Sequence, residues 1–429
     1  MDLWKLRLPV RRCLVLGASL LFAAAACAIG FAQIAQGKSG FLDRLAFAGL
    51  GLIVFAGSFQ LWLFGFGFLL WKRRTSLQKS AVGGLRSEIA SRTAIVMPIY
   101  NEDVERVYLG VRQTWLSVQK AGLAPHCDFY LLSDSTDEDI RRGEDEICAR
   151  LLEEFQGSAS TPHPDPLLDR GGEGVSAAVG DKQAAGPALR RIFLIRRTER
   201  GKYKAGNIAN FLEQHGGAYD FMLVLDADSV MLGESIKRLI LRMQTQANLA
   251  ILQTIVLPIR AEIPLARLMA FGNSRTLPLL ALGQYWFYGC DSVYWGHNAL
   301  VRIAPFMEHC NLPIMPGKPP LGGHIMSQDI VEAALVARAG WTVEWDMEPR
   351  GSFDETPANI LTYGRRDRRW CQGNFQHFWL IFGDGMKLAH RLYFGYPENR
   401  SKSLCTKTRN FHAKWWPDGL GDSWQISGR

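Results

Sequence analysis

Two carboxylates separated by one residue follow the apolar run at residues 221–225. The motif Asp226-Ala-Asp228 places two hard oxygen donors where the chain leaves a predicted strand. Because residues i and i+2 of an extended backbone point the same way, the pair suits a divalent cation such as Mg²⁺ that shares its other positions with phosphate oxygens and water. Strand-end Asp residues more often make turns or cap helices, and Ser229 is also available for capping, so the motif alone favours a structural role.

Acidic side chains also follow two other apolar runs. Asp134 follows the run at residues 129–132, and the first run ends in Pro98-Ile-Tyr-Asn-Glu102. This second motif combines a rigid turn with an aromatic face on Tyr100 for stacking a base and a carboxylate on Glu102. Acidic side chains thus follow three predicted strands, which indicates that they belong to one site. The sequence lacks a glycine-rich phosphate loop, so phosphate binding would depend on a metal and on basic side chains.

Basic and amide side chains form two further groups suited to phosphate oxygens. They are Lys202, Lys204 and Asn207, just before the helix-like segment that leads to the paired carboxylates, and Arg366 and Arg369 with Trp370, late in the domain. The planar guanidinium group of arginine matches diphosphate oxygens bidentately. Runs of Arg and Lys are more often solvated faces or headgroup contacts, but Trp370 favours a packed site or an interface.

Asp329, at the start of an apolar helical stretch, is the candidate general base. A carboxylate there could deprotonate an acceptor hydroxyl when a metal-bound leaving group carries much of the charge. Helix capping is the strong alternative for an acid at this position. Trp295-Gly-His-Asn298 supplies aromatic and amide groups suited to a sugar ring, although His297 alone would more often be a packing residue.

The elements that must position these groups form an alternating pattern. Short apolar runs predict strands, and the stretches between them, such as 104–121 and 234–247, are helix-like. The predicted strands are residues 94–97, 129–132, 192–195, 221–225 and 250–256. Alternation of strands and helices indicates an α/β sheet that is largely parallel. Continuously apolar strands are covered on both faces, and ligands of such sheets gather beyond the carboxyl ends of the strands.

Two charge-free stretches precede this pattern, at residues 13–36 and 45–71. Each exceeds the roughly 20 residues that a helix needs to cross a bilayer, and a cleaved signal peptide would have a shorter apolar region. Lys and Arg side chains cluster before the first stretch and after the second, which predicts that both ends face the cytoplasm. A pair of buried helices in a soluble core is the alternative, but the second stretch offers no polar face.

Composition sets limits on the class of protein. The chain has 429 residues, of which 48% are hydrophobic and 21% charged, which excludes a disordered chain. Its formal net charge is +8, and the segment 365–414 accounts for all of it. Because this basic segment follows membrane stretches, anionic lipid headgroups or a diphosphate substrate are favoured over nucleic acid. Eight cysteines without a C-x-x-C pair indicate neither a disulfide framework nor a zinc site, and fit a reducing, cytosolic setting.

The chain is therefore expected to divide into a membrane part and a soluble body. The segment 157–188 is rich in Ser, Ala, Pro and Gly without an apolar period and is interpreted as a disordered insertion. The predicted parts are a cytoplasmic N-terminus at 1–12, membrane helices at 13–36 and 45–71, a linker at 75–91, a catalytic domain at 92–385 and an atypical basic and aromatic tail at 386–429.

Taken in order, these motifs resemble those of the processive membrane glycosyltransferases of family 2. Within that family, Arg200-Gly-Lys-Tyr-Lys-Ala-Gly-Asn207 and Arg365-Arg-Asp-Arg-Arg-Trp370 are similar to the branch that makes osmoregulated periplasmic glucans. The resemblance implies an A-type glycosyltransferase fold, UDP-glucose as donor, a divalent metal (Mg²⁺ or Mn²⁺), an inverting transfer and a growing linear β-1,2-glucan. It also implies a multi-pass protein of the bacterial inner membrane with a cytoplasmic catalytic domain, contacts with membrane lipids and an acyl carrier protein as a partner.

The resemblance also implies roles for individual residues. Asp134 would contact the uridine, and Asp226 and Asp228 would bind the diphosphate-bound metal. Asp329 would accept the proton of the acceptor hydroxyl. The remaining candidates would bind the donor or the acceptor. They are Tyr100, Glu102, Lys204, Asn207, Trp295, His297, Asn298, Arg366, Arg369 and Trp370.

Departures from the family pattern leave alternatives open. Ser327-Gln328 stands where Thr-Glu is common before the base, and Arg366 stands where Gln is common. Residues 396–429 contain no further membrane stretch, whereas the family continues into spans that form an export channel, so a truncated or altered chain with impaired export is expected. The alternatives are a transferase of single sugars to a lipid carrier, and a catalytically degenerate membrane protein that binds a nucleotide sugar.

Overall fold

The computed structural model describes residues 3, 6–34, 40–73, 88–156, 191–198, 200–318, 321–357 and 359–394. The predicted disordered insertion at 157–188 lies outside these residues, as does nearly all of the predicted linker at 75–91 and most of the predicted tail at 386–429. The division of the chain into these parts stays a prediction.

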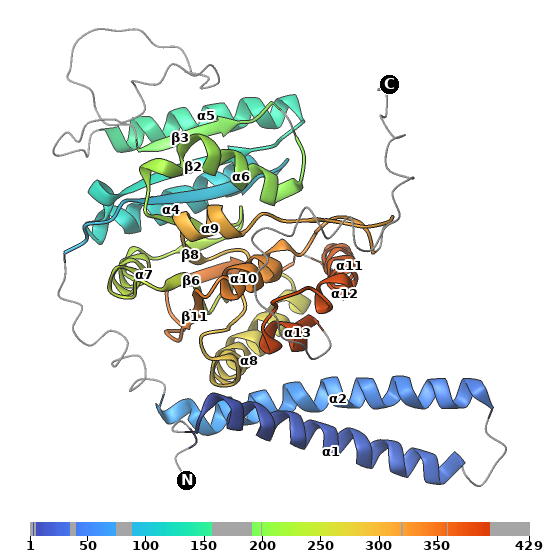
Figure 1. Ribbon diagram of the computed structural model, residues 1–429. Helices are drawn as coiled ribbons and strands as arrows, with labels where there is room; N and C mark the ends of the chain where they lie inside the picture. Colours follow the sequence, from blue (N-terminus) through green and yellow to red (C-terminus); the bar gives the residue numbers. More distant parts are fainter. Residues whose placement is uncertain are drawn as a thin grey trace, which may run out of the picture.

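The main sheet contains all five apolar runs that the sequence predicts as strands, together with two strands that were not predicted, β8 and β11. Its seven strands lie in the order β11-β6-β8-β4-β1-β2-β3 (Figure 1). They are β1 (Thr93–Ile99), β2 (Cys127–Ser133), β3 (Ile192–Arg196), β4 (Phe221–Val224), β6 (Leu249–Thr254), β8 (Ala299–Arg302) and β11 (Thr342–Asp346). All neighbouring pairs are parallel except the two that involve β8. The predicted α/β fold with a mostly parallel sheet is confirmed.

Helices cover both faces of this sheet (Figure 1). One face carries α4 (Val104–Lys120), α5 (Glu138–Gln156) and α7 (Gly233–Thr245), and the other carries α6 (Tyr203–His215), α9 (Ile303–His309) and α10 (Gln328–Arg338). Successive residues of β1 serve opposite layers, because Ile95 packs in the first core and Val96 in the second. A strand buried on both sides explains why these runs are continuously apolar.

A second sheet stands beside the carboxyl edge of the first. Its strands lie in the order β5-β12-β7 and are β5 (Val230–Met231), β12 (Ser352–Glu355) and β7 (Leu257–Ile259). β12 runs antiparallel to β5, with Phe353 opposite Val230. Because β5 begins two residues after Asp228, this pairing brings the end of β12 next to the paired carboxylates.

Shorter elements complete the described part of the chain. They are the helices α11 (Ile360–Gln376), α12 (Phe378–Ile381) and α13 (Leu388–Phe394), the 3₁₀ turns η2 (Trp71–Arg73), η3 (Ala124–His126) and η4 (Gly216–Ala218), and the two-stranded sheet of β9 (Ile314–Met315) and β10 (Gly323–His324). The side chain of Asn359 accepts a hydrogen bond from the amide of Thr362 and so caps the N-terminus of α11.

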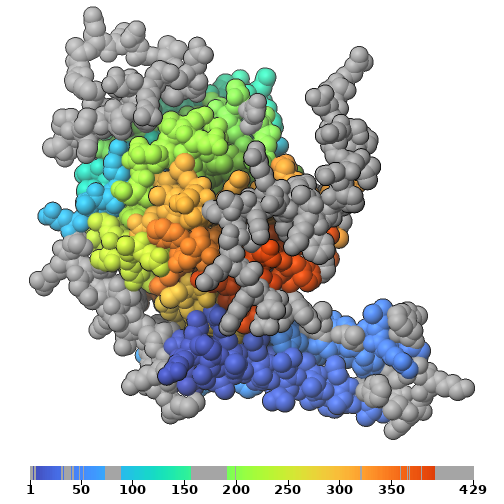
Figure 2. Space-filling model, viewed as in Figure 1, coloured from blue at the N-terminus to red at the C-terminus, as the bar shows by residue number. Residues whose placement is uncertain are grey.

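The N-terminal helices α1 (Leu8–Ile34) and α2 (Phe41–Leu70) form a hairpin that projects from the rest of the molecule (Figure 2). Within the described residues, Leu8–Ile29 and Asp43–Leu70 are long and apolar enough to cross a membrane. α2 also packs on α8 (Pro264–Tyr288). A Cβ atom on Gly67 would lie 1.8 Å from the carbonyl oxygen of Leu279, so the two helices cross at backbone contact.

Candidate active site

The paired carboxylates lie on a tight turn at the end of β4. The amide of Ser229 donates to the carbonyl oxygen of Asp226 at 3.0 Å, and the amide of Asp226 donates to the Ser229 hydroxyl at 3.2 Å. Asp226 and Asp228 were predicted to lie on extended backbone, and this detail is wrong, because β4 ends at Val224 and Ser229 closes a turn. Both carboxylates nevertheless stay close enough for Asp226 to raise the pKa of Asp228.

Lys204 binds Asp226 directly. Its ammonium group forms an ion pair with Asp226 and donates to the carbonyl oxygen of Gly296 at 2.8 Å. Burial alone would raise the pKa of Asp226, but Lys204, His297 and Arg366 outweigh it and hold that pKa at about 2. Asp226 is therefore a carboxylate at any physiological pH, with 38% of its side chain exposed.

Asp228 meets a third carboxyl group, Asp354 of β12, through a side-chain hydrogen bond. Burial, together with Asp354 and Asp226, raises the pKa of Asp228 to about 7. Among the described residues, no three His, Cys, Asp or Glu side chains are arranged so that they alone could hold a metal ion. A cation here would need further ligands. Phosphate oxygens of a substrate and water molecules, as predicted from the sequence, are suitable ligands.

Asp329 lies in the first turn of α10, next to the Gly296 carbonyl that Lys204 binds. Gly296 has φ +81°, and a Cβ atom there would lie 3.1 Å from Asp329 Oδ2, so only glycine leaves room for this carboxylate. Burial raises the pKa of Asp329, although the amide of Ile330, Lys204 and His297 oppose this. One turn further along α10, burial and the nearby Asp329 raise the pKa of Glu332 to about 8.

The segment Trp295–Asn298 contributes to the site in two ways. His297 lies near the acids, because it lowers the pKa values of Asp226, Asp228 and Asp329, and its Nδ1 is 3.4 Å from the Ser229 hydroxyl. Trp295 is half-buried with its ring edge-on to Trp345. Asn298 is fully buried, and its amide donates to the Ser352 hydroxyl and the Phe353 carbonyl, so it fixes β12. Direct contacts of Trp295 and Asn298 with a substrate stay predictions.

Asp134 is already bound by an arginine. Both of its oxygens accept hydrogen bonds from Arg197, at 2.7 and 2.6 Å, and the Arg197 side chain is only 6% exposed. Arg197 also donates to the carbonyl oxygen of Tyr203, directly before Lys204. Asn207 is buried and donates to the carbonyl oxygen of Leu132, which ties α6 to the end of β2. A role for Asp134 and Asn207 in donor binding stays a prediction.

The remaining predicted residues lie around these acids. Tyr100 is 58% exposed and available for stacking. Glu102 pairs with Arg106 at 2.6 Å, and burial, opposed by Arg106 and assisted by Asp228 and Asp226, raises its pKa. Arg366 Nη2 is 3.9 Å from Asp354 Oδ2.

In the basic motif on α11, the side chain of Trp370 packs against that of Arg366. The guanidinium group of Arg366 lies over the ring of Trp370, 4.6 Å from its centroid. Trp370 and Arg369 are both exposed on α11. This geometry leaves the motif open to a ligand while Arg366 is oriented from two sides.

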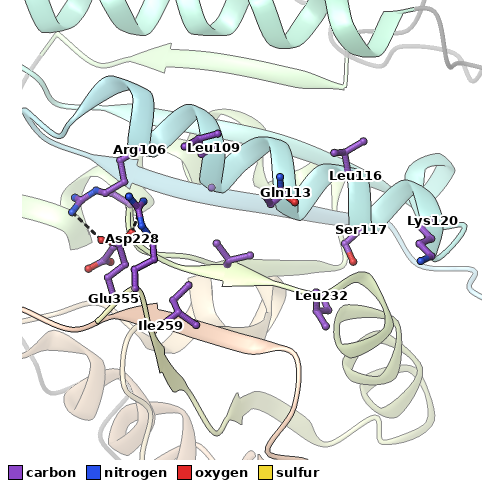
Figure 3. Close-up of a pocket in the computed structure, with 14 residues that line it drawn as sticks. Arg106, Leu109, Gln113, Leu116, Ser117, Lys120, Asp228, Leu232, Ile259 and Glu355 are labelled. Atoms are coloured by element: carbon purple, nitrogen blue, oxygen red, sulfur yellow. Dashed lines mark hydrogen bonds and ion pairs between the residues drawn. The ribbon is translucent and has the colours of Figure 1, made fainter. Parts of the chain in front are cut away.

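A groove of about 580 Å³ borders the acids on one side. It runs between α4 and the second sheet, with Asp228 and Glu355 at one end and Lys120 at the other (Figure 3). Arg106 and Arg260 both pair with Glu355 there, at 3.5 and 3.0 Å. Asp134 and Asp329 do not line this groove.

Comparison with known proteins shows similarity to glycosyltransferases. Residues 221–413 match Glycosyl transferase family group 2. The chain is 40% identical over 358 residues to "Glucans biosynthesis glucosyltransferase H" of Klebsiella pneumoniae and 36% identical over 353 residues to that of Rhodopseudomonas palustris, which is 83% and 81% of this chain. The chain resembles these glucosyltransferases. It spans 38% and 44% of their lengths.

A solved structure with a similar chain path is "Mannosyltransferase PcManGT from Pyrobaculum calidifontis in complex with GDP-Man and Mn2+". It is 12% identical, with 77% of this chain and 79% of the other covered and a TM-score of 0.45. A likeness of this size carries no argument about substrate or metal.

Three residues at the site were missed by sequence reasoning. Arg197, Glu332 and Asp354 each complete a contact with a predicted residue. For Glu332 a signal was available, because it stands three residues after Asp329 on a predicted helix and must share its face. For Asp354 and Arg197 the contacts depend on strand pairings between distant segments.

Proposed function

We propose that the chain is a glucosyltransferase that uses UDP-glucose and a divalent cation to extend a β-1,2-linked glucan. The observation that carries the proposal is the convergence of Asp226 and Asp329 on Lys204 and the Gly296 backbone, with Asp228 on the same turn as Asp226. The sequence similarity to the glucans biosynthesis glucosyltransferases supports the choice of substrate class.

The acidic turn fits a divalent cation. Burial is the largest cause that raises the pKa values of Asp228 and Asp354, and the nearby Asp226 raises both further, so neither carboxyl group ionises as readily as an exposed acid. Asp226 and Asp228 would hold the cation, either Mg²⁺ or Mn²⁺. The bound cation would supply charge stabilisation for the departing nucleoside diphosphate.

Asp329 is the proposed base of the transfer. The acceptor hydroxyl oxygen forms a bond to the anomeric carbon, the bond from that carbon to the diphosphate oxygen breaks, and the hydroxyl proton passes to Asp329. A single displacement of this kind inverts the anomeric configuration. The raised pKa of Asp329 makes the carboxylate a better proton acceptor near neutral pH.

Basic side chains would neutralise the leaving diphosphate. Arg366 is held between Asp354 and the Trp370 ring, which keeps its planar donors oriented. We place Tyr100 against the uracil ring and Arg369 beside the diphosphate, and we place Trp295 and His297 on the acceptor side.

The proposed setting is the bacterial inner membrane, with the hairpin of α1 and α2 spanning the lipid and the catalytic domain in the cytoplasm. The length and apolar character of both helices support this setting. An acyl carrier protein as a further partner stays a prediction.

The test uses the purified chain in proteoliposomes with radiolabelled UDP-glucose. UDP release and glucan formation are measured separately, with Mg²⁺, with Mn²⁺ and with EDTA. We expect metal-dependent UDP release and labelled glucan. A lipid-linked product would instead favour transfer to a lipid carrier, and nucleotide binding without turnover would favour a degenerate protein.

A further inference from the structure

Strand β12 carries Asp354 to the acidic turn. In the antiparallel pairing with β5, Ser352 lies opposite Met231 and Phe353 opposite Val230. Continuing this register places residue 354 beside the backbone of residues 228 and 229. The side chain of Asp354 is 12% exposed, so it points into the site and not into solvent.

Asp354 touches two motifs that are far apart in the sequence. Its carboxyl group forms a hydrogen bond with that of Asp228, and its Oδ2 is 3.9 Å from Nη2 of Arg366. One motif lies on the turn after β4 and the other on α11. Asp354 therefore links the acidic turn to the basic-aromatic motif.

The backbone of β12 is fixed on both sides of Asp354. On one side the Ser352 hydroxyl is 2.7 Å from that of Thr254 and accepts a hydrogen bond from Asn298 at 2.9 Å. On the other side Glu355 pairs with Arg260 at 3.0 Å. A side chain on so constrained a strand has a defined direction before any ligand arrives.

We propose that Asp354 is a positioning residue of the donor site, which orients the Asp228 carboxylate toward a divalent cation and aligns Arg366 with the diphosphate. Asp354 itself acts through these two groups and does not contact the transferred sugar. The inference rests on the proposed function, because it assumes a nucleoside diphosphate and a cation at the acidic turn.

The test measures Mn²⁺ binding by electron paramagnetic resonance, with and without UDP, for the intact protein and for Asp354→Asn. Asn keeps the shape of the side chain and removes its charge. Groups that orient metal ligands typically change metal affinity by about 10–100-fold. We therefore expect Mn²⁺ affinity in the presence of UDP to fall about tenfold or more, and Asp354→Glu to recover part of the loss.

Asp346→Asn is the matched control. Asp346 is also a buried acid paired with an arginine, Arg238 at 2.7 Å, but it stands on β11 away from the acidic turn. We expect it to change thermal stability and to leave Mn²⁺ affinity unchanged. Equal Mn²⁺ binding by the intact protein and Asp354→Asn would overturn the inference, as would an equal loss in Asp346→Asn.

Measuring UDP release from UDP-glucose beside Mn²⁺ binding separates this inference from the proposed function. If the intact protein binds Mn²⁺ and UDP but releases no UDP from UDP-glucose, the proposed function fails. The Mn²⁺ affinities of the Asp354 variants still decide whether Asp354 positions the metal ligands. If the intact protein binds no Mn²⁺ even with UDP, both are overturned.

Discussion

The pKa values of the acidic side chains at this site are set by their neighbours more than by residue type. Asp226 and Asp228 stand two residues apart, yet Lys204 holds the pKa of the first at about 2, while burial and Asp354 raise that of the second to about 7. Asp226 is thus charged at all physiological pH values, whereas the charge of Asp228 depends on the pH and on whether a cation is bound. Sequence spacing predicted the pair but not this division.

Replacing the proposed base gives a direct prediction at the residue level. Asp329→Asn removes the proton acceptor and keeps the shape of the side chain beside Gly296. We expect kcat for glucan formation to fall about 10²–10⁴-fold, while Mn²⁺ and UDP binding stay unchanged. Rates are measured with radiolabelled UDP-glucose, and undiminished turnover in the variant would exclude Asp329 as the base.

The buried Glu332 predicts a dependence of stability on pH. Its folded pKa of about 8 lies above the ordinary value of 4.5, so the folded state binds more protons and stability falls as pH rises from about 4.5 to about 8. The slope from one such group is about 1.4 kcal/mol per pH unit. Glu332→Gln should flatten this decline and raise the melting temperature at pH 8 more than at pH 5. An identical pH profile for both proteins would contradict the assignment.

The Arg197 and Asp134 pair predicts a strong non-additivity. Removing one partner of a buried ion pair costs about 3–5 kcal/mol, because the other charge is left uncompensated. We expect Arg197→Ala to destabilise the domain by that amount, and Asp134→Ala with Arg197→Ala to cost less than the sum of the single changes. Urea unfolding of the four proteins measures the coupling, and strict additivity would rule it out.

At the level of elements, the sequence was informative wherever a strand is buried on both faces. The apolar runs of β1, β2 and β4 were visible without any structure, and each lies within two residues of its predicted position. β12 was not visible, because Ser352–Glu355 contains only one apolar residue, Phe353, and is held by pairing with β5, more than 100 residues earlier. Contacts such as that of Asp354 follow from this pairing and not from local pattern.

Close crossing of α2 and α8 predicts that two neighbouring glycines respond differently to the same change. A Cβ on Gly67 would meet the Leu279 carbonyl at 1.8 Å, whereas at Gly65 nothing lies within 4 Å. Gly67→Ala should force the helices apart and lower the melting temperature. Gly65→Ala should leave it unchanged or raise it, since Ala gains about 0.5–1 kcal/mol in a helix. Equal effects of both changes, measured in one detergent, would show that the helices do not cross here.

At the level of the whole molecule, Asp291 joins the hairpin to the α/β part of the chain. It accepts from Arg12 of α1 at 3.0 Å and from Lys387, directly before α13, at 2.7 Å. Arg12 also donates to the carbonyl oxygen of Tyr288 at 2.9 Å, so a cation stands at the C-terminus of α8, where the helix dipole favours it. The start of α1 and the α/β part of the chain must therefore lie on the same side of any membrane that the hairpin spans.

This arrangement predicts the sidedness of two positions. Cys371 on α11 is exposed, and Gly40 lies at the start of α2, at the opposite end of the hairpin from Arg12. A membrane-impermeant maleimide should label Cys371 in inverted vesicles and the introduced cysteine of Gly40→Cys in spheroplasts, with labelled sites identified by mass spectrometry. Labelling of Cys371 in spheroplasts would reverse the proposed orientation.

The arginine contacts at the end of α8 also have a mechanical consequence. α8 ends at Tyr288, and Gly296, whose carbonyl oxygen accepts from Lys204, follows only eight residues later. The contact of Arg12 with Tyr288 is thus one short stretch of chain away from Gly296, which binds the lysine that pairs with Asp226. Tilting of the hairpin within a bilayer would be transmitted along this stretch, so the proposed sugar transfer is expected to depend on the lipid environment.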